Sequence, residues 1–220
     1  MPRAAEPSLL LSLDDEPWRP SQRLFDLAAA IAGLAPRIVH RKLAARSAGV
    51  RWFETFPGEH YHLLTALAVI LEPRIVWEFG TDTGMSAVAL LEGCATAKIW
   101  TVDLVDWATR PQAWLTVEDE PQVTQVVANM AAPWLFERLE APLAEADLVF
   151  VDGPKDGSTE AAFLTRLAAI PFRHAPIVVF DDIRVANMLY VWRGICRPKM
   201  DLTSFGHFTG TGLVDWKGTL

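Results

Sequence analysis

Residues 74–84, RIVWEFGTDTG, are the stretch that decides the fold. The run IVWEF is short and rich in β-branched and aromatic residues, which predicts a buried strand. Gly80 and Gly84 follow at GxxxG spacing, and residues 83–93, TGMSAVALLEG, then predict a helix. Glycine allows a sharp backbone turn and a close approach to a ligand, and open α/β sheets bind their ligands beyond the carboxyl ends of the strands. The order strand, glycine-rich turn and helix therefore predicts a ligand-binding loop.

Downstream of this loop, strand-like and helical patterns alternate. The expected strands are residues 98–104 (KIWTVDL), 146–153 (ADLVFVDG) and 176–183 (PIVVFDDI), and the expected helices are residues 159–170 and 186–195. Strands and helices that alternate at this spacing predict parallel βαβ units in a doubly wound α/β sheet. Residues 117–130, VEDEPQVTQVVANM, are predicted to be helical, and residues 131–144 are ambiguous.

The two ends of the chain differ from this alternating pattern. Residues 201–216, DLTSFGHFTGTGLVDW, predict two strands joined by a tight glycine-rich turn, and the strands should be antiparallel because no helix separates them. Before residue 74, helices are expected at residues 21–36, 37–46 and 58–71. We therefore expect residues 1–57 to be an N-terminal lead with helices that belongs to the same unit, and residues 58–220 to be the ligand-binding domain.

Length, composition and charge favour a single globular domain and disfavour several classes of protein. A chain of 220 residues with 51% apolar and 21% charged residues suits one α/β domain. Its net charge of −7 and the lack of a basic stripe disfavour nucleic acid as a partner. Cys94 and Cys196 form no metal-binding or disulfide pattern. No apolar run is long enough for a membrane span or a secretory leader, so we expect no membrane partner and a cytoplasmic protein.

The charges in and near the loop indicate the kind of ligand. The dinucleotide fingerprint GxGxxG places a pyrophosphate on a helix N-terminus, but Glu78 and Asp82 would repel a pyrophosphate. These carboxylates suit a cofactor that carries an ammonium and a sulfonium. Asp103 ends the second expected strand, about twenty residues after the glycines, where an acid can accept both ribose hydroxyls of an adenosine cofactor. Asp103 alone does not separate NAD from S-adenosylmethionine.

Four motifs in order, WEFGTDTGMSA, TVDL, FVDGPKDGS and VVFDDI, resemble those of class I S-adenosylmethionine-dependent methyltransferases. The closer likeness is to small metal-dependent O-methyltransferases and macrocin-type natural-product O-methyltransferases, and it covers roughly residues 58–216. The resemblance implies a Rossmann-like, mostly parallel seven-stranded sheet that ends in an antiparallel hairpin. It also implies that the loop surrounds the methionine part of the cofactor and that Asp103 holds the ribose. The expected cofactor-binding residues are Glu78, Gly80, Thr81, Asp82, Gly84, Ser86, Asp103 and Asp152.

A second group of acids predicts a metal site. Asp152 follows one expected strand, and Asp181 and Asp182 follow the next, so adjacent parallel strands would bring all three to one edge of the sheet. Three converging carboxylates are costly unless a cation or a proton neutralises them, and oxygen ligands suit Mg²⁺. Metal-dependent O-methyltransferases have Asp-x-x-Lys and then Asp-Asn at these places, so the resemblance makes Lys155 part of the group. Here Asp181-Asp182 replaces Asp-Asn; alternatively, some of these acids cap a helix or face solvent.

Methyl transfer to oxygen is an in-line displacement in which the acceptor oxygen lies about 3 Å from the methyl carbon, opposite the sulfur. A neutral hydroxyl is a weak nucleophile, so a base has to take its proton. Lys155 is the first candidate, provided that desolvation and a cation depress its pKa, although it can equally be a surface lysine. His207, in the predicted hairpin turn, is the second candidate. Asp152 completes the expected catalytic set.

The sequence thus predicts S-adenosylmethionine-dependent methyl transfer to a hydroxyl of a small molecule, helped by a divalent cation. Two alternatives stay open. One is a non-catalytic cofactor-binding protein on the same fold, and the other is an NAD(P)-dependent oxidoreductase, although GxGxxG is missing. The acceptor is open as well, because residues 105–121 match no motif. The apolar N-terminal helix could support a homodimer.

Overall fold

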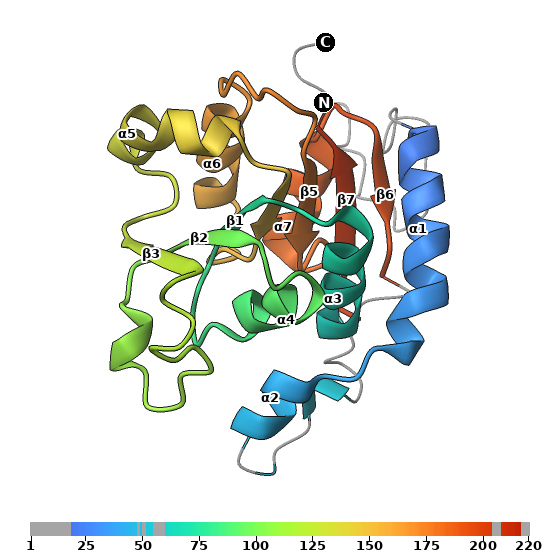
Figure 1. Cartoon of the computed structure of the whole chain (residues 1–220). Coiled ribbons are helices and arrows are strands. Elements are labelled where there is room, and N and C mark those ends of the chain that lie inside the picture. Colours follow the sequence, from blue (N-terminus) through green and yellow to red (C-terminus); the bar gives the residue numbers. More distant parts are fainter. Residues whose placement is uncertain (1–18, 48, 50–51, 55–59, 204–207, 217–220) are drawn as a thin grey trace, which may run out of the picture.

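A single mixed sheet forms the centre of the molecule (Figure 1). The computed structural model describes residues 19–47, 49, 52–54, 60–203 and 208–216. The strand order is β3-β2-β1-β4-β5-β7-β6; the first five strands are parallel, and β7 is antiparallel to both β5 and β6. The strands are β1 (Ile75–Phe79), β2 (Lys98–Asp103), β3 (Val123–Val127), β4 (Leu148–Val151), β5 (Ile177–Asp181), β6 (Lys199–Asp201) and β7 (Thr211–Asp215). The predicted mostly parallel seven-stranded sheet with an antiparallel end is confirmed.

Helices cover both faces of this sheet (Figure 1). On one face lie α1 (Gln22–Leu34), α3 (His60–Leu71) and α4 (Met85–Gly93), and on the other lie α5 (Pro133–Ala144), α6 (Ser158–Leu167) and α7 (Ala186–Gly194). The short helix α2 (Arg41–Arg46) lies at the lower end of the view. Leu148 and Phe150 of β4 belong to the core with α3 and α4, whereas Val149 and Val151 belong to the core with α5 to α7. Because side chains alternate between the faces of a strand, the central strands are apolar on both sides.

The helix α1 packs on the same core as α3 and α4. Its buried residues Leu24, Leu27 and Ile31 belong to that core. Ser21 caps the helix by accepting a hydrogen bond from the N–H of Leu24 at 3.3 Å. Its hydroxyl also donates to Asp215 of β7 at 2.7 Å, which ties the helix to the sheet. Among the helices that the structure describes, none has the length and apolar character needed to cross a bilayer.

The predicted helix at residues 117–130 is wrong. The structure has turns there, followed by strand β3 at the edge of the sheet. Pro121 interrupts the helical pattern, and the run from Val123 to Val127 is rich in β-branched residues, which favour a strand. The ambiguous stretch that follows contains α5, which begins on Pro133, a residue suited to the first turn of a helix.

Two other predicted elements differ in extent. The helix expected at residues 37–46 covers only Arg41–Arg46, because residues 35–37 form a separate 3₁₀ turn after α1. The antiparallel pair begins at Lys199, and residues 202–210 separate its strands, which is longer than the tight turn predicted from the glycines. Residues 204–207 of that connection, including the candidate base His207, lie outside the described residues.

Candidate active site

The loop between β1 and α4 requires glycine at two positions. Gly80 has a φ of +113°, and a Cβ atom there would lie 1.9 Å from the backbone oxygen of Asp152. Gly84 has a φ of +83°, and a Cβ atom there would lie 2.3 Å from Cγ of Leu115. Residues with a side chain rarely adopt such φ angles. The two glycines therefore let this loop contact both the end of β4 and the segment after β2.

Glu78, the acid that precedes the loop, is fully buried at the end of β1. Its carboxylate accepts hydrogen bonds from the hydroxyl of Ser86 and from Oγ1 of Thr101, the latter at 2.5 Å. Burial raises the pKa of Glu78 from 4.5 to about 7, and the two hydroxyl donors offset only part of this effect. Glu78 and Ser86 thus bind each other in this structure, and the carboxylate supports the loop from within the protein.

A chain of polar side chains continues from Glu78 beneath the loop. The hydroxyls of Thr101 and Thr81 are 2.6 Å apart, and Nε2 of Gln125 on β3 donates to Thr81 at 3.1 Å. Thr81 is buried, so its hydroxyl serves this network. Buried polar groups need such partners because an unmatched one is costly. The network fixes the first half of the loop on the first three strands of the sheet.

Asp103, at the end of β2, holds the exposed side of the same loop. Its Oδ2 accepts the N–H of Asp82 at 2.9 Å, and its Oδ1 accepts the N–H of Val105 at 3.0 Å. Asp82 has a φ of +43°, a conformation uncommon for residues other than glycine, and its side chain points outward, within 3.4 Å of Arg110. The loop conformation therefore depends on the Asp103 carboxylate, which also borders a cavity.

A cavity of about 340 Å³ lies beyond the carboxyl ends of β1, β2 and β4. Its volume falls in the range of small-molecule sites. Residues from the glycine loop, from the ends of β2 and β4, and from the turns after β3 and β4 form its walls. They are Gly80, Val102, Asp103, Leu104, Ala128, Asn129, Met130, Asp152, Gly153, Pro154, Asp156 and Thr159. The predicted ribose-binding acid and the predicted metal ligand Asp152 therefore border one space.

The predicted acidic cluster is present beside this cavity. Oxygen atoms of Asp152, Asp181 and Asp182 all lie within 4.8 Å of one another. The Nζ atom of Lys155 lies 2.6 Å from Oδ1 of Asp152 and 3.0 Å from Oδ2 of Asp182. Such a donor set, with carboxylate oxygens from two strand ends, fits a hard divalent cation. In this structure the ammonium of Lys155 binds two of the three carboxylates.

The charges of this cluster determine one another's protonation. Loss of hydration raises the pKa of Asp152, and the neighbouring Asp181 raises it further, while Lys155 lowers it. Burial of the Lys155 ammonium lowers its pKa, but Asp152, Asp181 and Asp182 outweigh this effect, so that the pKa of Lys155 is raised. The sequence analysis made Lys155 a candidate base on the condition that its pKa is depressed. Without a cation, this condition is not met. Lys155 carries a proton here.

Solved structures share the architecture described above, although neither a family model nor a curated protein sequence matches this chain. An S-adenosylhomocysteine-bound methyltransferase from Podospora anserina superposes with a TM-score of 0.52 at 17% identity, over 90% of this chain and 97% of its own. A protein provisionally assigned as a caffeoyl-CoA O-methyltransferase from Staphylococcus aureus gives 0.56 at 18%, over 89% and 98%. One provisionally assigned as an O-methyltransferase from Klebsiella pneumoniae gives 0.54 at 15%, over 90% and 100%. The chain has the class I methyltransferase fold.

On this methyltransferase fold, the turn after β4 depends on a residue that the sequence analysis missed. Glu160 is fully buried, and its carboxylate accepts the N–H groups of Lys155 at 2.7 Å and Gly157 at 2.8 Å. It therefore fixes the backbone of Lys155, whose φ of +64° is unusual for a lysine. A glutamate three residues after the N-cap residue is one half of the capping-box pattern, and this signal could have been found in the sequence.

Tyr61 of α3 is the second residue that the sequence analysis missed. Its pKa is raised, first by burial and then by the negative charges of Asp152, Asp181 and Glu78. The phenol of Tyr61 therefore lies close enough to these acids to be influenced by their charge. No local pattern marks this residue, because only the packing of α3 against the sheet brings it there.

Proposed function

We propose that this chain transfers a methyl group from S-adenosylmethionine to a hydroxyl of a small molecule, with the help of a divalent cation. One observation carries the proposal: the cavity bordered by the glycine loop and Asp103 also reaches Asp152, and the acidic cluster with Lys155 adjoins it. A site for an adenosine cofactor and a site for an acceptor oxygen would therefore be neighbours. The S-adenosylhomocysteine bound by the Podospora anserina relative supports this cofactor.

The residues of the loop would bind and orient the cofactor. Gly80 contributes only backbone to the cavity wall, so a ligand can approach that backbone closely. The Asp103 carboxylate borders the cavity and can accept ribose hydroxyls in addition to its two backbone donors. Asp152, which borders the cavity beside the glycine loop, favours a ligand with positive charge and disfavours a pyrophosphate, which argues against an NAD(P)-dependent oxidoreductase.

The acidic cluster would position the acceptor and manage its proton. Asp152, Asp181 and Asp182 would hold the cation, whose bound form supplies Lewis-acid chemistry that lowers the pKa of a coordinated hydroxyl. Neutralising these carboxylates also removes the effect that raises the pKa of Lys155 and leaves the effect of its burial, which lowers it. We therefore keep Lys155 as the proposed proton acceptor in the metal-loaded enzyme.

Calorimetric titration of S-adenosylhomocysteine into the metal-stripped protein tests the cofactor, with NAD⁺ as the control ligand. Binding of the former alone supports the proposal, and binding of neither by folded protein refutes it. Manganese binding, followed by electron paramagnetic resonance, tests the metal site separately. We expect Asp181→Ala to lose manganese and to retain S-adenosylhomocysteine. Normal manganese binding by this variant would refute the proposed ligand set, and binding of cofactor without turnover of any hydroxylated acceptor would favour a non-catalytic cofactor-binding protein.

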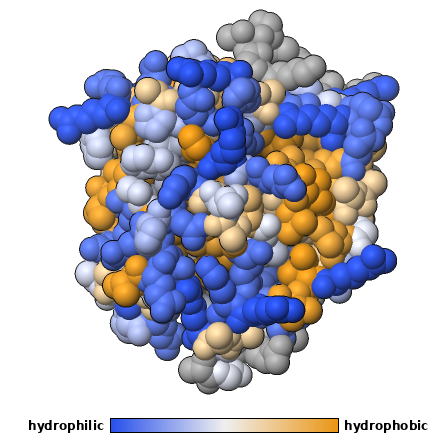
Figure 2. Space-filling view, in the orientation of Figure 1, coloured by the Kyte–Doolittle hydropathy of each residue, from blue (hydrophilic) through white to orange (hydrophobic). Residues whose placement is uncertain are grey.

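We also propose a homodimer through the apolar surface of α1 and α3. Phe25 of α1 is 53% exposed and Val69 of α3 is 40% exposed. Figure 2 shows apolar residues gathered over α3 and the neighbouring side of α1. Large exposed apolar patches mark interaction sites. Light scattering should give the mass of two chains for the wild type and of one chain for Phe25→Ser, and a monomeric wild type would contradict the proposal.

A further inference from the structure

The segment between β2 and β3, residues 105–121, packs against the second half of the glycine loop. The backbone N–H of Trp114 donates to the carbonyl oxygen of Thr83 at 2.7 Å. The buried side chain of Leu115 fills the space beside Gly84. The segment that matched no motif in the sequence therefore forms one wall of the loop.

Arg46 of α2 holds this segment in place. Its guanidinium donates to the carbonyl oxygen of Trp114 at 2.8 Å and to both carboxylate oxygens of Asp119, at 2.7 and 3.1 Å. Asp119 is only 2% exposed, and it also accepts the N–H of Thr116 at 3.0 Å. A bidentate pair of arginine and carboxylate has a fixed geometry. Arg46 and Asp119 therefore set the position of Trp114 relative to α2.

The helix α2 is itself anchored on the far end of α4, the helix that begins at the loop. Glu92, near the end of α4, accepts the N–H of Lys42, and its Oε2 lies 2.6 Å from Nδ1 of the buried His40. One end of α2 thus rests on the end of α4, and its other end holds the segment that covers the start of α4. The loop and its helix are fixed between these two attachments.

We propose that Arg46 and Asp119 are positioning residues for the cofactor site: by holding residues 105–121 on the loop, they keep Gly84 and its neighbours in the conformation that binds S-adenosylmethionine. This inference rests on the proposed function, because it assigns the loop to that cofactor. Neither residue lines the cavity, so an effect on affinity has to act through the loop. Removal of Arg46 leaves the buried carboxylate of Asp119 with only the more distant Lys42, whose Nζ lies 3.8 Å from Oδ1, and this favours movement of the segment away from the loop.

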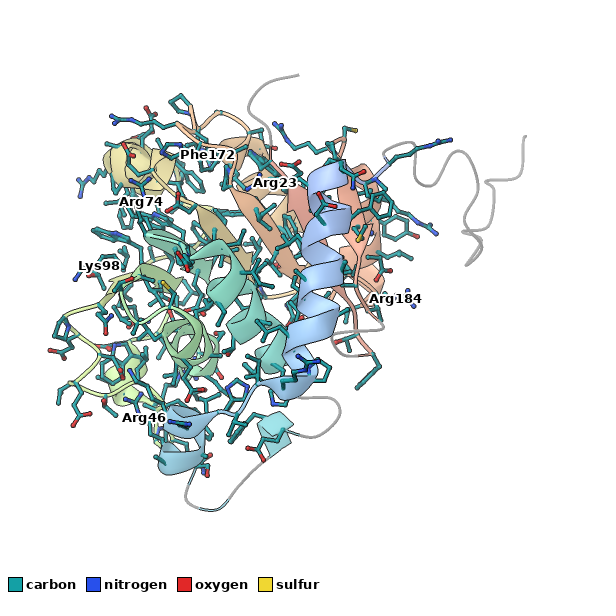
Figure 3. The ribbon with its side chains drawn as sticks, turned by 45° about the vertical axis from the view of Figure 1, so that its right-hand side comes forward. Arg23, Arg46, Arg74, Lys98, Phe172 and Arg184 are labelled. Carbon is teal, nitrogen blue, oxygen red and sulfur yellow. The ribbon has the colours of Figure 1, made fainter. Side chains whose placement is uncertain are left out.

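Arg46→Met and Asp119→Asn test this role, with Arg46→Lys as the conservative variant. The matched control is Asp215→Asn, since Asp215 is equally buried and pairs with Arg23 of α1 at 2.9 Å. Figure 3 shows Arg23 and Arg46 at opposite ends of the molecule. By calorimetry, we expect the dissociation constant of S-adenosylhomocysteine to rise about tenfold in Arg46→Met and Asp119→Asn, and less in Arg46→Lys. The control should unfold at a lower temperature yet keep the wild-type affinity.

Hydrogen exchange gives a second measurement. The amides of residues 80–84 and 105–121 should exchange faster in Arg46→Met than in the wild type, and at the wild-type rate in Asp215→Asn. If Arg46→Met does not fold, Asp119→Asn and Arg46→Lys give the same comparison. If the folded Arg46 and Asp119 variants bind S-adenosylhomocysteine with wild-type affinity, the inference is overturned and the proposed function is unaffected. The same holds if Asp215→Asn loses as much affinity as they do. A wild-type protein that does not bind S-adenosylhomocysteine overturns both.

Discussion

Replacement of Glu78 by glutamine should remove a large pH dependence of stability. The carboxyl group is fully buried, and its pKa in the folded chain is raised from 4.5 to about 7. Between these two values the unfolded chain loses the proton of Glu78 and the folded chain keeps it. The free energy of unfolding therefore falls as the pH rises from about 4.5 to about 7, and above that range this group changes it no further.

The size of this effect follows from the two pKa values. One pKa unit corresponds to about 1.36 kcal/mol, so the difference between 4.5 and about 7 is worth about 3 kcal/mol of unfolding free energy. This is a large part of the roughly 5–15 kcal/mol by which domains are stable. Glutamine has the same shape and keeps one oxygen for the hydroxyls of Ser86 and Thr101, but it does not titrate. Asp152 titrates in both proteins, so the difference between their pH profiles reports Glu78 together with its coupling to Asp152.

Urea unfolding measures this difference. The fluorescence of the nine tryptophans reports the transition, at a series of values from roughly pH 5 to pH 8. We expect the wild type to lose about 2.5 kcal/mol more than Glu78→Gln over this range, which begins slightly above the unfolded pKa. Circular dichroism of the variant at each pH shows that the fold is retained. Parallel profiles for the two proteins would refute the reasoning, because the buried carboxyl would then titrate as it does in water.

Three further substitutions have defined outcomes. Gly84→Ala should cost at least about 2 kcal/mol in urea unfolding and weaken S-adenosylhomocysteine binding, because its φ is +83° and the new methyl group meets Leu115; Leu115→Ala in the same chain should recover part of the stability. Manganese should increase the unfolding temperature of Lys155→Met by more than it increases that of the wild type, because the ammonium that competes for the carboxylates is gone. Equal increases in the two proteins would contradict this. Asp215→Asn should lower the unfolding free energy by about 2 kcal/mol, because its two partners on α1 lose a charged acceptor, and an unchanged urea midpoint would count against this.

Most of the fold could be predicted from the sequence because its central elements are locally unambiguous. The strands β1, β4 and β5 are buried on both faces, so they are apolar runs that a short window detects. Strand β3 was missed because it lies at the edge of the sheet, where the adjacent polar residues Thr124 and Gln125 interrupt the valines and break the alternation typical of a strand. Pairing with β2 determines the conformation of β3, and a short window of sequence does not contain the residues of β2.

The candidate site divides in the same way. Gly80, Gly84 and Asp103 follow strand ends, where spacing along the chain fixes position in space. The side-chain environments depend on tertiary packing: the hydroxyl of Ser86 binds Glu78, and the charges of acids on other elements raise the pKa of Tyr61 on α3. Protonation could not be predicted either, since it depends on how close the carboxylates lie to Lys155.

The buried Glu78 also provides a test of where the sulfonium would lie. S-adenosylmethionine and S-adenosylhomocysteine differ by one methyl group and one positive charge, and a positive charge near a protonated carboxyl favours ionisation. Asp152 and Asp103, which border the cavity, already raise the pKa of Glu78, so charges in the cavity act on it. Near pH 7 the methylated cofactor should therefore release more protons on binding than its product, and Glu78→Gln should abolish the difference. Calorimetry in two buffers of different ionisation enthalpy counts these protons. Equal release for both ligands in the wild type would mean that Glu78 does not sense the sulfur and that its raised pKa reflects the folding of the loop alone.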